Sequence, residues 1–189
     1  IRADDTFTVN GWSNNWRITN RVFRDTTNWY HAVVVVDSTQ STANDRIKIY
    51  INGIQETSFS STVNENQNHD YGWNNTIEHR IGSVNYSTNN YYLDGYLAEV
   101  NNIDGTAVGS TSRTNAGTGA TEYVIDEFGQ FKNDVWTPKA YTGSYGTNGF
   151  RLDFSDNSAA TSVTLGKDRS GQGNDFTLNN MAVSDSVLD

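Results

Sequence analysis

Residues 29–53 read WYHAVVVVDSTQSTANDRIKIYING, and this stretch decides the class of fold. The run Val33 to Val36 is apolar on both faces of an extended chain, which indicates a central strand. In RIKIYI, three isoleucines alternate with Lys48 and Tyr50, which is the period of a half-buried strand. The dipeptide Asn52-Gly53 then favours a two-residue hairpin turn. We therefore expect two strands and a turn, with IQETSF returning beside them.

Short strands and polar turns continue through the rest of the chain. Two strands are expected around Asn10-Gly11, and further strands are expected in IEHRIGSV and YYLDGYLAEVNNID. Residues 60–76 read as a long exposed loop, and helical periodicity is nearly absent. The pattern predicts an all-β fold, an antiparallel jelly-roll β-sandwich. We expect a main sandwich over 1–104, a Gly/Ser/Thr-rich linker or arm over 105–121, and C-terminal strands over 122–189.

Composition and charge exclude several classes of partner and site. The net charge of -9 argues against a nucleic-acid partner, since phosphate binding requires clustered Lys and Arg. The chain contains no Cys, which excludes disulfides, Cys-ligated zinc and thiol nucleophiles. No apolar run approaches the roughly 20 residues of a membrane helix, so we expect no membrane partner.

A set of motifs in residues 29–104, about two-fifths of the chain, resembles the laminin-G-like, concanavalin A-like lectin and glucanase domains. That family has a Trp-x-His strand, a Tyr-x-Asn-Gly strand end, an Ile-Gly strand and an Asp-Gly-x-x-x-Glu-Val strand. The matching residues are Trp29, His31, Tyr50, Asn52, Gly53, Ile81, Gly82, Asp94, Gly95, Glu99 and Val100. The resemblance implies a concanavalin A-like jelly roll.

The C-terminal half is similar to laminin-G-like domains of marine bacteriophage virion proteins, through NNIDGTAV, DEFGQF, VWTPKAYTGSYGTNGFRLDFSDNS and LGKDRSGQGNDFTLNN. This similarity implies a tail-fibre or capsid-surface protein, located at the virion surface outside the cell. Its partners would be other virion proteins and further copies of itself. The similarity also implies sheet strands before the point where this chain begins. The segment around DRSGQGND either completes the same sandwich, which we favour, or starts a second unit.

Aromatic and amide side chains mark the candidate contact surface. Aromatic rings stack on sugars, while Asn groups bind hydroxyls, but aromatic loops serve protein interfaces equally well. Packing of the loop onto the core is the third alternative. The candidate glycan or partner contacts are Tyr71, Trp73, Asn74, Asn75, Tyr86, Tyr91 and Tyr92.

Acidic turns near the C-terminus form a candidate calcium site. The fold resemblance implies an optional calcium ion at a loop end, and calcium prefers several carboxylate and carbonyl oxygens. The candidate ligands are Asp153, Asp156, Asp168, Asn174 and Asp175, with Ser170 and Asn157 nearby. Gly171 and Gly173 allow a tight turn there. A polar turn without metal is the favoured alternative, so no cofactor is required.

Catalytic residues are not indicated. A glycosidase needs two positioned carboxylates, and the spacing of Glu122 and Asp126 differs from that of the glucanase branch. His31 lies in a strand without a nucleophile or acid beside it, and His69 and His79 lack metal-ligand spacing. We therefore expect a non-enzymatic phage virion surface module, a tail fibre or capsid decoration, that contacts virion proteins and host-surface glycans. The alternatives are a stand-alone lectin and, third, a glycoside hydrolase of the same fold.

Overall fold

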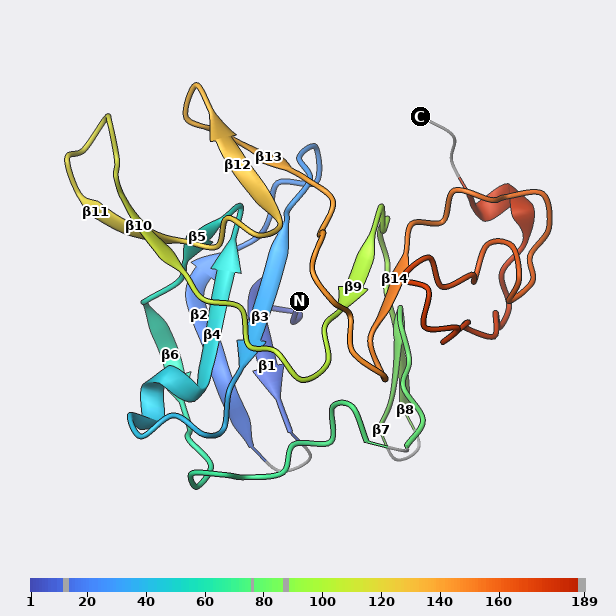
Figure 1. The fold of residues 1–189 in the computed structure, drawn as a ribbon, viewed down its shortest axis with the longest axis horizontal. Helices are drawn as coiled ribbons and strands as arrows, with labels where there is room; N and C mark the ends of the chain where they lie inside the picture. The colour runs from blue at the N-terminus through green and yellow to red at the C-terminus, as the bar shows by residue number, and fades with distance from the viewer. Residues whose placement is uncertain (12–13, 76, 87–88, 187–189) are drawn as a thin grey trace. The chain divides into compact units, whose positions relative to one another are not determined.

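A computed structural model gives the fold and describes residues 1–11, 14–75, 77–86 and 89–186. The fold is all-β, with several antiparallel sheets, two short 3-10 turns and no α-helix in these ranges (Figure 1). It is compatible with a β-sandwich. None of the described helical turns is long and apolar enough to cross a membrane.

The chain divides into two compact units, each built from two separate segments. Unit 1 comprises residues 1–71 and 107–142, and unit 2 comprises residues 72–106 and 143–189. The strands of unit 1 are β1 (Thr6–Asn10), β2 (Asn15–Val22), β3 (Ala32–Val36), β4 (Ile47–Ile51), β5 (Ile54–Gln55), β6 (Phe59–Thr62), β10 (Thr111–Thr114), β11 (Thr121–Val124), β12 (Gly129–Lys132) and β13 (Val135–Pro138), with the 3-10 turn η1 (Ala43–Arg46). Those of unit 2 are β7 (Ser83–Tyr86), β8 (Asn89–Tyr92), β9 (Val100–Asn102) and β14 (Phe150–Leu152), with η2 (Val183–Asp185).

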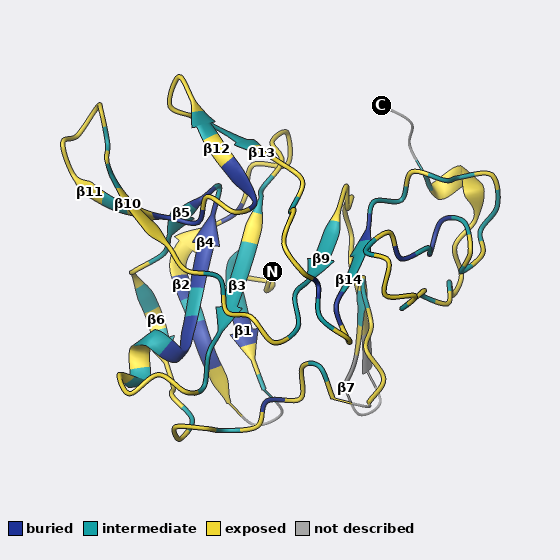
Figure 2. Cartoon of the chain, in the orientation of Figure 1, coloured by how far each residue is buried: buried dark blue, intermediate teal, exposed yellow. Residues whose placement is uncertain are grey.

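Two sheets enclose the core of unit 1. One has the strand order β1-β2-β6, and the other has the order β10-β11-β5-β4-β3. The predicted alternation in β4 is confirmed, because Ile47, Ile49 and Ile51 are at most 2% exposed and pack in this core (Figure 2). Tyr50, on the opposite face, is also buried, so β4 is covered on both sides.

The predicted hairpin turn at Asn52-Gly53 is confirmed. Asn52 has φ of 48° and Gly53 has φ of 80°, as a type I′ turn between β4 and β5 requires. The indole of Trp136 packs against the glycine, since a Cβ built on Gly53 would lie 2.3 Å from its Cε3 atom. Asn52 also exchanges hydrogen bonds with the backbone of His31, which ties the turn to the start of β3.

The prediction that the valine run forms a central strand is wrong for β3. Within the described residues, β3 pairs only with β4 and lies at the edge of its five-stranded sheet. Val33 to Val36 are half-buried. An apolar run indicates that both faces of a strand are covered. Whether one or both of its edges hydrogen-bond to a neighbouring strand depends on segments far away in the sequence.

The segment predicted as a linker over 105–121 contains the first strand and the turn of a β-hairpin, whose second strand, β11, begins at Thr121. Strand β10 pairs with β11 along four residues, and Asn115 bonds the backbone N–H groups of Gly117 and Thr118 in the connecting turn. The Arg113 guanidinium bonds Glu122 across the strands at 2.9 Å and stacks 3.6 Å from the centre of the Phe131 ring. These cross-strand contacts order a segment whose composition resembles a linker.

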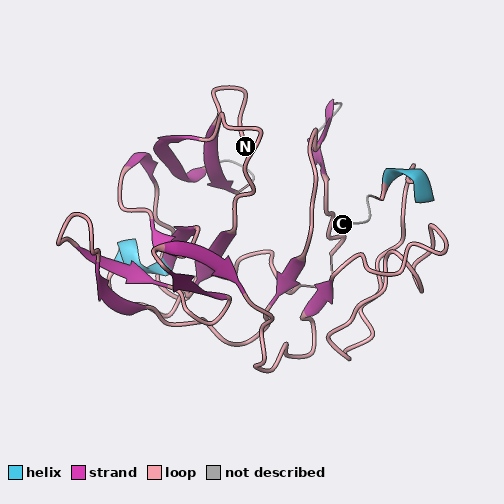
Figure 3. Cartoon of the chain, turned by 90° about the horizontal axis from the view of Figure 1, so that it is seen from above, coloured by secondary structure: helices cyan, strands magenta, loops and turns pink. Residues whose placement is uncertain are grey.

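Unit 2 is held by two ribbons of two strands each. β7 pairs with β8, and β14 pairs with β9. The C-terminal segment 143–186 therefore contributes one described strand, and Figure 3 draws most of the remaining backbone towards the C-terminus as loop. The strands predicted in 77–104 are shorter than expected, because residues 93–99 lie outside strands.

Candidate functional site

Tyr71 is a core residue of unit 1, so its prediction as a glycan or partner contact is wrong. Its side chain is 7% exposed. The ring packs edge-on against Trp16, with 4.9 Å between ring centroids, and against His69 at 4.7 Å. Trp16 in turn donates its indole N–H to Glu65 at 2.8 Å. A ring enclosed in this way offers no face on which a sugar or partner could stack.

The next three predicted residues belong to unit 2. Trp73 is 43% exposed and Asn75 is exposed, so both reach the surface. Asn74 has an internal role, because its side-chain oxygen accepts a hydrogen bond from Asn102 at 2.8 Å and its carbonyl accepts one from Asn148 at 3.3 Å. Asn74 also has φ of 65°, a conformation that Asn tolerates better than most residues.

Tyr91 and Tyr92 are exposed, as predicted for contact residues, at 57% and 71%. The side chain of Tyr86 lies outside the described residues. Tyr91 pairs with Val84 in the β7–β8 ribbon, and Val84 is itself 54% exposed. A ribbon of two strands covers little of either face, which accounts for this exposure.

Exposure of large apolar side chains continues beyond β8. Leu93 is 51% exposed, Tyr96 is 74% exposed and Leu97 is 43% exposed. We call residues 91–97 the tyrosine segment. Sequence reasoning missed Tyr96 and Leu97 because it placed them within a strand. The Asp94-Gly95 dipeptide, a turn signal, could have indicated the break between β8 and β9.

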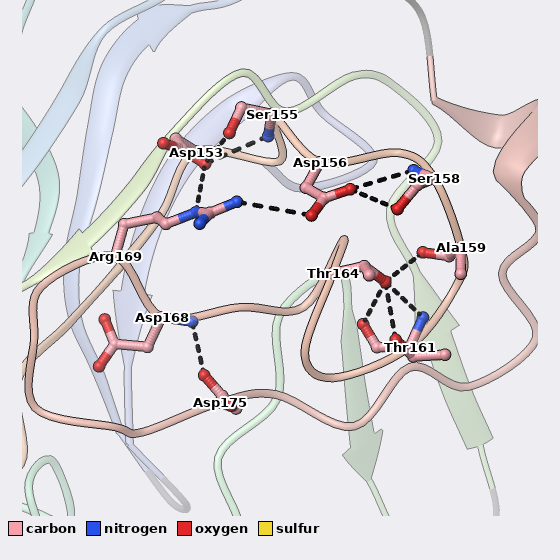
Figure 4. A network of polar contacts seen from close by, with 10 residues as sticks. All are labelled: Asp153, Ser155, Asp156, Ser158, Ala159, Thr161, Thr164, Asp168, Arg169 and Asp175. Carbon is pink, nitrogen blue, oxygen red and sulfur yellow. Dashed lines mark hydrogen bonds and ion pairs between the residues drawn. The ribbon is translucent and has the colours of Figure 1, made fainter.

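The predicted calcium ligands Asp153 and Asp156 bind an arginine and their own turns. Asp153 accepts hydrogen bonds from the N–H and hydroxyl of Ser155, and Asp156 accepts the same pair from Ser158. Arg169 lies between the two carboxylates, 3.7 Å from Asp153 and 3.9 Å from Asp156 (Figure 4). The guanidinium thus provides the positive charge in the place where these two carboxylates converge.

Asp168 organises the DRSGQGND loop from within. It is 5% exposed and accepts four hydrogen bonds: from the N–H groups of Arg151, Ser170 and Asn174 and from the Ser170 hydroxyl, at 2.8 to 3.0 Å. Burial alone raises the pKa of the Asp168 carboxyl, but the bonds from these N–H and hydroxyl donors lower it, and the net pKa is below the ordinary value.

The remaining residues of this loop complete the same network. The Asp175 carboxylate accepts the Asp168 N–H at 2.8 Å (Figure 4), and the Asn174 side chain donates to the carbonyls of Thr147 and Gly149. Gly171 and Gly173 have φ of 88° and 82°, which explains why glycine occupies both positions.

These oxygens do not fit a calcium ion. Calcium requires six to eight converging oxygens, whereas the oxygens of Asp168 accept hydrogen bonds from within the chain, and those of Asp153 and Asp156 also face a guanidinium. In the described ranges, no group of three or more His, Cys, Asp or Glu side chains is placed to hold a metal ion. In the described structure the motif forms a hydrogen-bonded polar turn.

The two carboxylates considered for catalysis are engaged in the β10–β11 hairpin. Glu122 bonds both Arg113 and Asn115, and Asp126 accepts a hydrogen bond from the Thr111 hydroxyl at 3.3 Å. The bonds from Asn115 and Arg113 lower the pKa of Glu122, although burial opposes them. A carboxylate with a lowered pKa is a poor general acid at neutral pH.

Comparison with known proteins finds no match: no protein-family model, no curated protein and no solved structure is similar to this chain. The exposure and chemistry of the tyrosine segment make it the candidate functional site of unit 2.

Proposed function

We propose that the chain is a non-enzymatic binding module of a bacteriophage virion surface, part of a tail fibre or a capsid decoration. Its tyrosine segment would contact a neighbouring virion protein. The proposal includes a concanavalin A-like jelly-roll topology for the β-sandwich and assembly with other copies of the chain. The virion location and the topology rest on the sequence resemblance described above.

Exposure of the tyrosine segment is the observation that carries the binding role. Five of its seven residues have large apolar side chains, each between 43% and 74% exposed: Tyr91, Tyr92, Leu93, Tyr96 and Leu97. Soluble surfaces rarely expose contiguous apolar patches without a function. Tyrosine is enriched at protein interfaces because it buries a large ring and retains a hydroxyl for hydrogen bonding.

Two leucines within the segment favour a protein partner over a sugar. Leu93 and Leu97 offer no hydrogen-bonding group and no flat ring, so they suit an apolar protein surface. A sugar would use the aromatic rings alone, with amide groups such as that of Asn75. Exposed Trp73 supports this glycan-binding lectin as the second candidate. On a particle with many copies, weak binding at each site is sufficient because avidity multiplies it.

Cryo-electron microscopy of the native assembly that contains this chain tests the proposal. Burial of the tyrosine segment against another protein chain is the expected result. A segment that is open to solvent in the assembled particle would contradict the structural role. A glycan array with the isolated chain would then test the lectin alternative.

A pair of substitutions assigns the contact to the segment. The double variant Tyr92→Ser/Tyr96→Ser removes two exposed rings and should lower incorporation into the assembly at least tenfold while folding is unchanged. The control is Tyr123→Ser on β11, where the tyrosine is 52% exposed but belongs to unit 1. Equal incorporation of the double variant and the control would refute the assignment.

A further inference from the structure

A pocket of about 290 Å³ lies in unit 1, beside η1 and strands β4, β5 and β6. Its lining is mostly polar and offers cations, amides and hydroxyl groups, with one aromatic ring. The lining includes Arg17, Asn44, Lys48, Gln55, Thr57 and Phe59. The volume is close to the lower end of the range for small-molecule sites.

Arg17 on β2 brings a buried positive charge to this pocket. The residue is 1% exposed. Its Nη1 atom donates to the carbonyls of Trp16 and Val63, and its Nη2 atom donates to the Asn44 carbonyl and the Asn64 side-chain oxygen. All four acceptors are neutral. Among the described residues, no carboxylate forms an ion pair with Arg17, and no acceptor is bonded to its Nε atom.

The two carboxylates that line the pocket are already paired with other cations. Asp45 lies 3.3 Å from the Lys48 ammonium, and Glu56 bonds Arg21 at 2.9 Å. Arg17 therefore has no carboxylate partner among the described residues, and its guanidinium lies 5.9 Å from the centre of the Phe59 ring. Burial without a counter-ion is costly, and burial accordingly lowers the pKa of Arg17. An anion in the pocket would restore the balance.

We propose that this pocket binds a small polyhydroxylated carboxylate of monosaccharide size, that is, a sugar acid. The carboxylate accepts hydrogen bonds from the Arg17 Nε–H and the Lys48 ammonium. Hydroxyl groups of the ligand bond Gln55 and Thr57, and its apolar edge packs on Phe59. Unit 1 contains this pocket and unit 2 contains the tyrosine segment, so the inference does not rest on the proposed function.

The net charge of the whole chain bears on how this ligand is held. At -9, the chain repels anions at long range, so recognition depends on short-range contacts within the pocket. We expect dissociation constants of the order of millimolar.

Titration of the full chain with D-galacturonate, followed by NMR of its backbone and arginine Nε–H groups, tests the proposal. D-galactose is the neutral comparison, since it lacks the carboxylate. We expect galacturonate to bind at least tenfold more tightly than galactose, with shifts at Arg17, Lys48 and Thr57.

Lys48→Met is the diagnostic variant, because Lys48 is partly exposed and its ammonium bonds only Asp45 in the described structure. Replacement of the buried Arg17 risks unfolding. Lys48→Met should weaken galacturonate binding at least threefold and leave galactose binding unchanged. Lys132→Met, an exposed lysine on β12, is the matched control and should bind as the wild type does.

Three outcomes would overturn the proposal. They are equal affinity for galactose and galacturonate, no binding of galacturonate at about 50 mM, and identical galacturonate affinity in Lys48→Met and wild type. The third outcome is interpretable when the spectrum of Lys48→Met shows that the variant is folded.

Discussion

Replacement of the buried Asp168 by Asn should destabilise the DRSGQGND loop strongly. The carboxylate accepts two hydrogen bonds at each oxygen, three of them from the backbone N–H groups of Arg151, Ser170 and Asn174. Asparagine retains one oxygen and directs an NH₂ group at the donors that bonded the other. At least one buried N–H then loses its acceptor, at about 1–3 kcal/mol, and the retained bonds lose their charge. We expect a total cost of about 2–4 kcal/mol.

Amide hydrogen exchange measures this cost where it arises. The N–H groups of Arg151 and Asn174 should exchange roughly 30 to 1,000 times faster in Asp168→Asn than in wild type, since 1.4 kcal/mol corresponds to tenfold. Asp156→Asn is the matched control. The Asp156 carboxylate accepts hydrogen bonds from Ser158 in its own turn and lies 3.9 Å from Arg169, so its loss should leave the N–H groups of Arg151 and Asn174 bonded. Exchange rates in Asp168→Asn that stay within about threefold of the control would refute this account of the loop.

The same carboxylate predicts a pH dependence. The folded pKa of Asp168 is lower than its ordinary value of 3.8, so its hydrogen bonds stabilise the loop fully above that value. The stabilisation is lost as the pH falls from about 3.8 through the lower folded pKa. Protection of the Asn174 N–H should decline over this range in wild type, and Asp168→Asn should lack this component. A wild-type profile that is flat below pH 4 would contradict the assignment.

Three further predictions concern the turn, the metal and the hairpin. Gly53→Ala should lower the free energy of unfolding by about 2–4 kcal/mol, because φ is positive there and the added Cβ would clash with Trp136. Gly119→Ala, where φ is 70° and the surrounding space is open, should lower it by only about 1 kcal/mol. Urea unfolding measures both free energies, and equal losses would contradict the packing argument. Addition of calcium or EDTA should leave the melting temperature unchanged. A rise in melting temperature with calcium would show that the chain binds the ion. Arg113→Met should lower the free energy of unfolding by about 1–2 kcal/mol through lost contacts with Glu122 and the Phe131 ring, and an unchanged urea midpoint would refute that role.

The candidate site shows where local sequence signals stop being sufficient. Tyr91 and Tyr92 were predicted as surface residues and are exposed. Tyr71 was placed with them because it belongs to the polar loop 60–76, but its ring packs against Trp16 of β2 and against His69 of the same loop. Burial of a loop residue depends on which elements cover it, and no periodic signal in 60–76 reports that.

The sequence by itself determined the features that depend on neighbouring residues. Alternation in 47–51 specified which side chains of β4 face the core, and Asn52-Gly53 specified the turn, because both properties follow from backbone geometry over a few residues. The glycines of DRSGQGND likewise marked a tight loop in advance.

Only the tertiary structure decided how these segments pair. It placed β3 at the edge of its sheet, paired 111–114 with 121–124, and brought the acceptors of Asn44, Val63 and Asn64 to Arg17. The physical reason is that strand pairing and charge compensation depend on contacts between residues far apart in the chain. Similar local patterns are consistent with many such arrangements, and packing selects one.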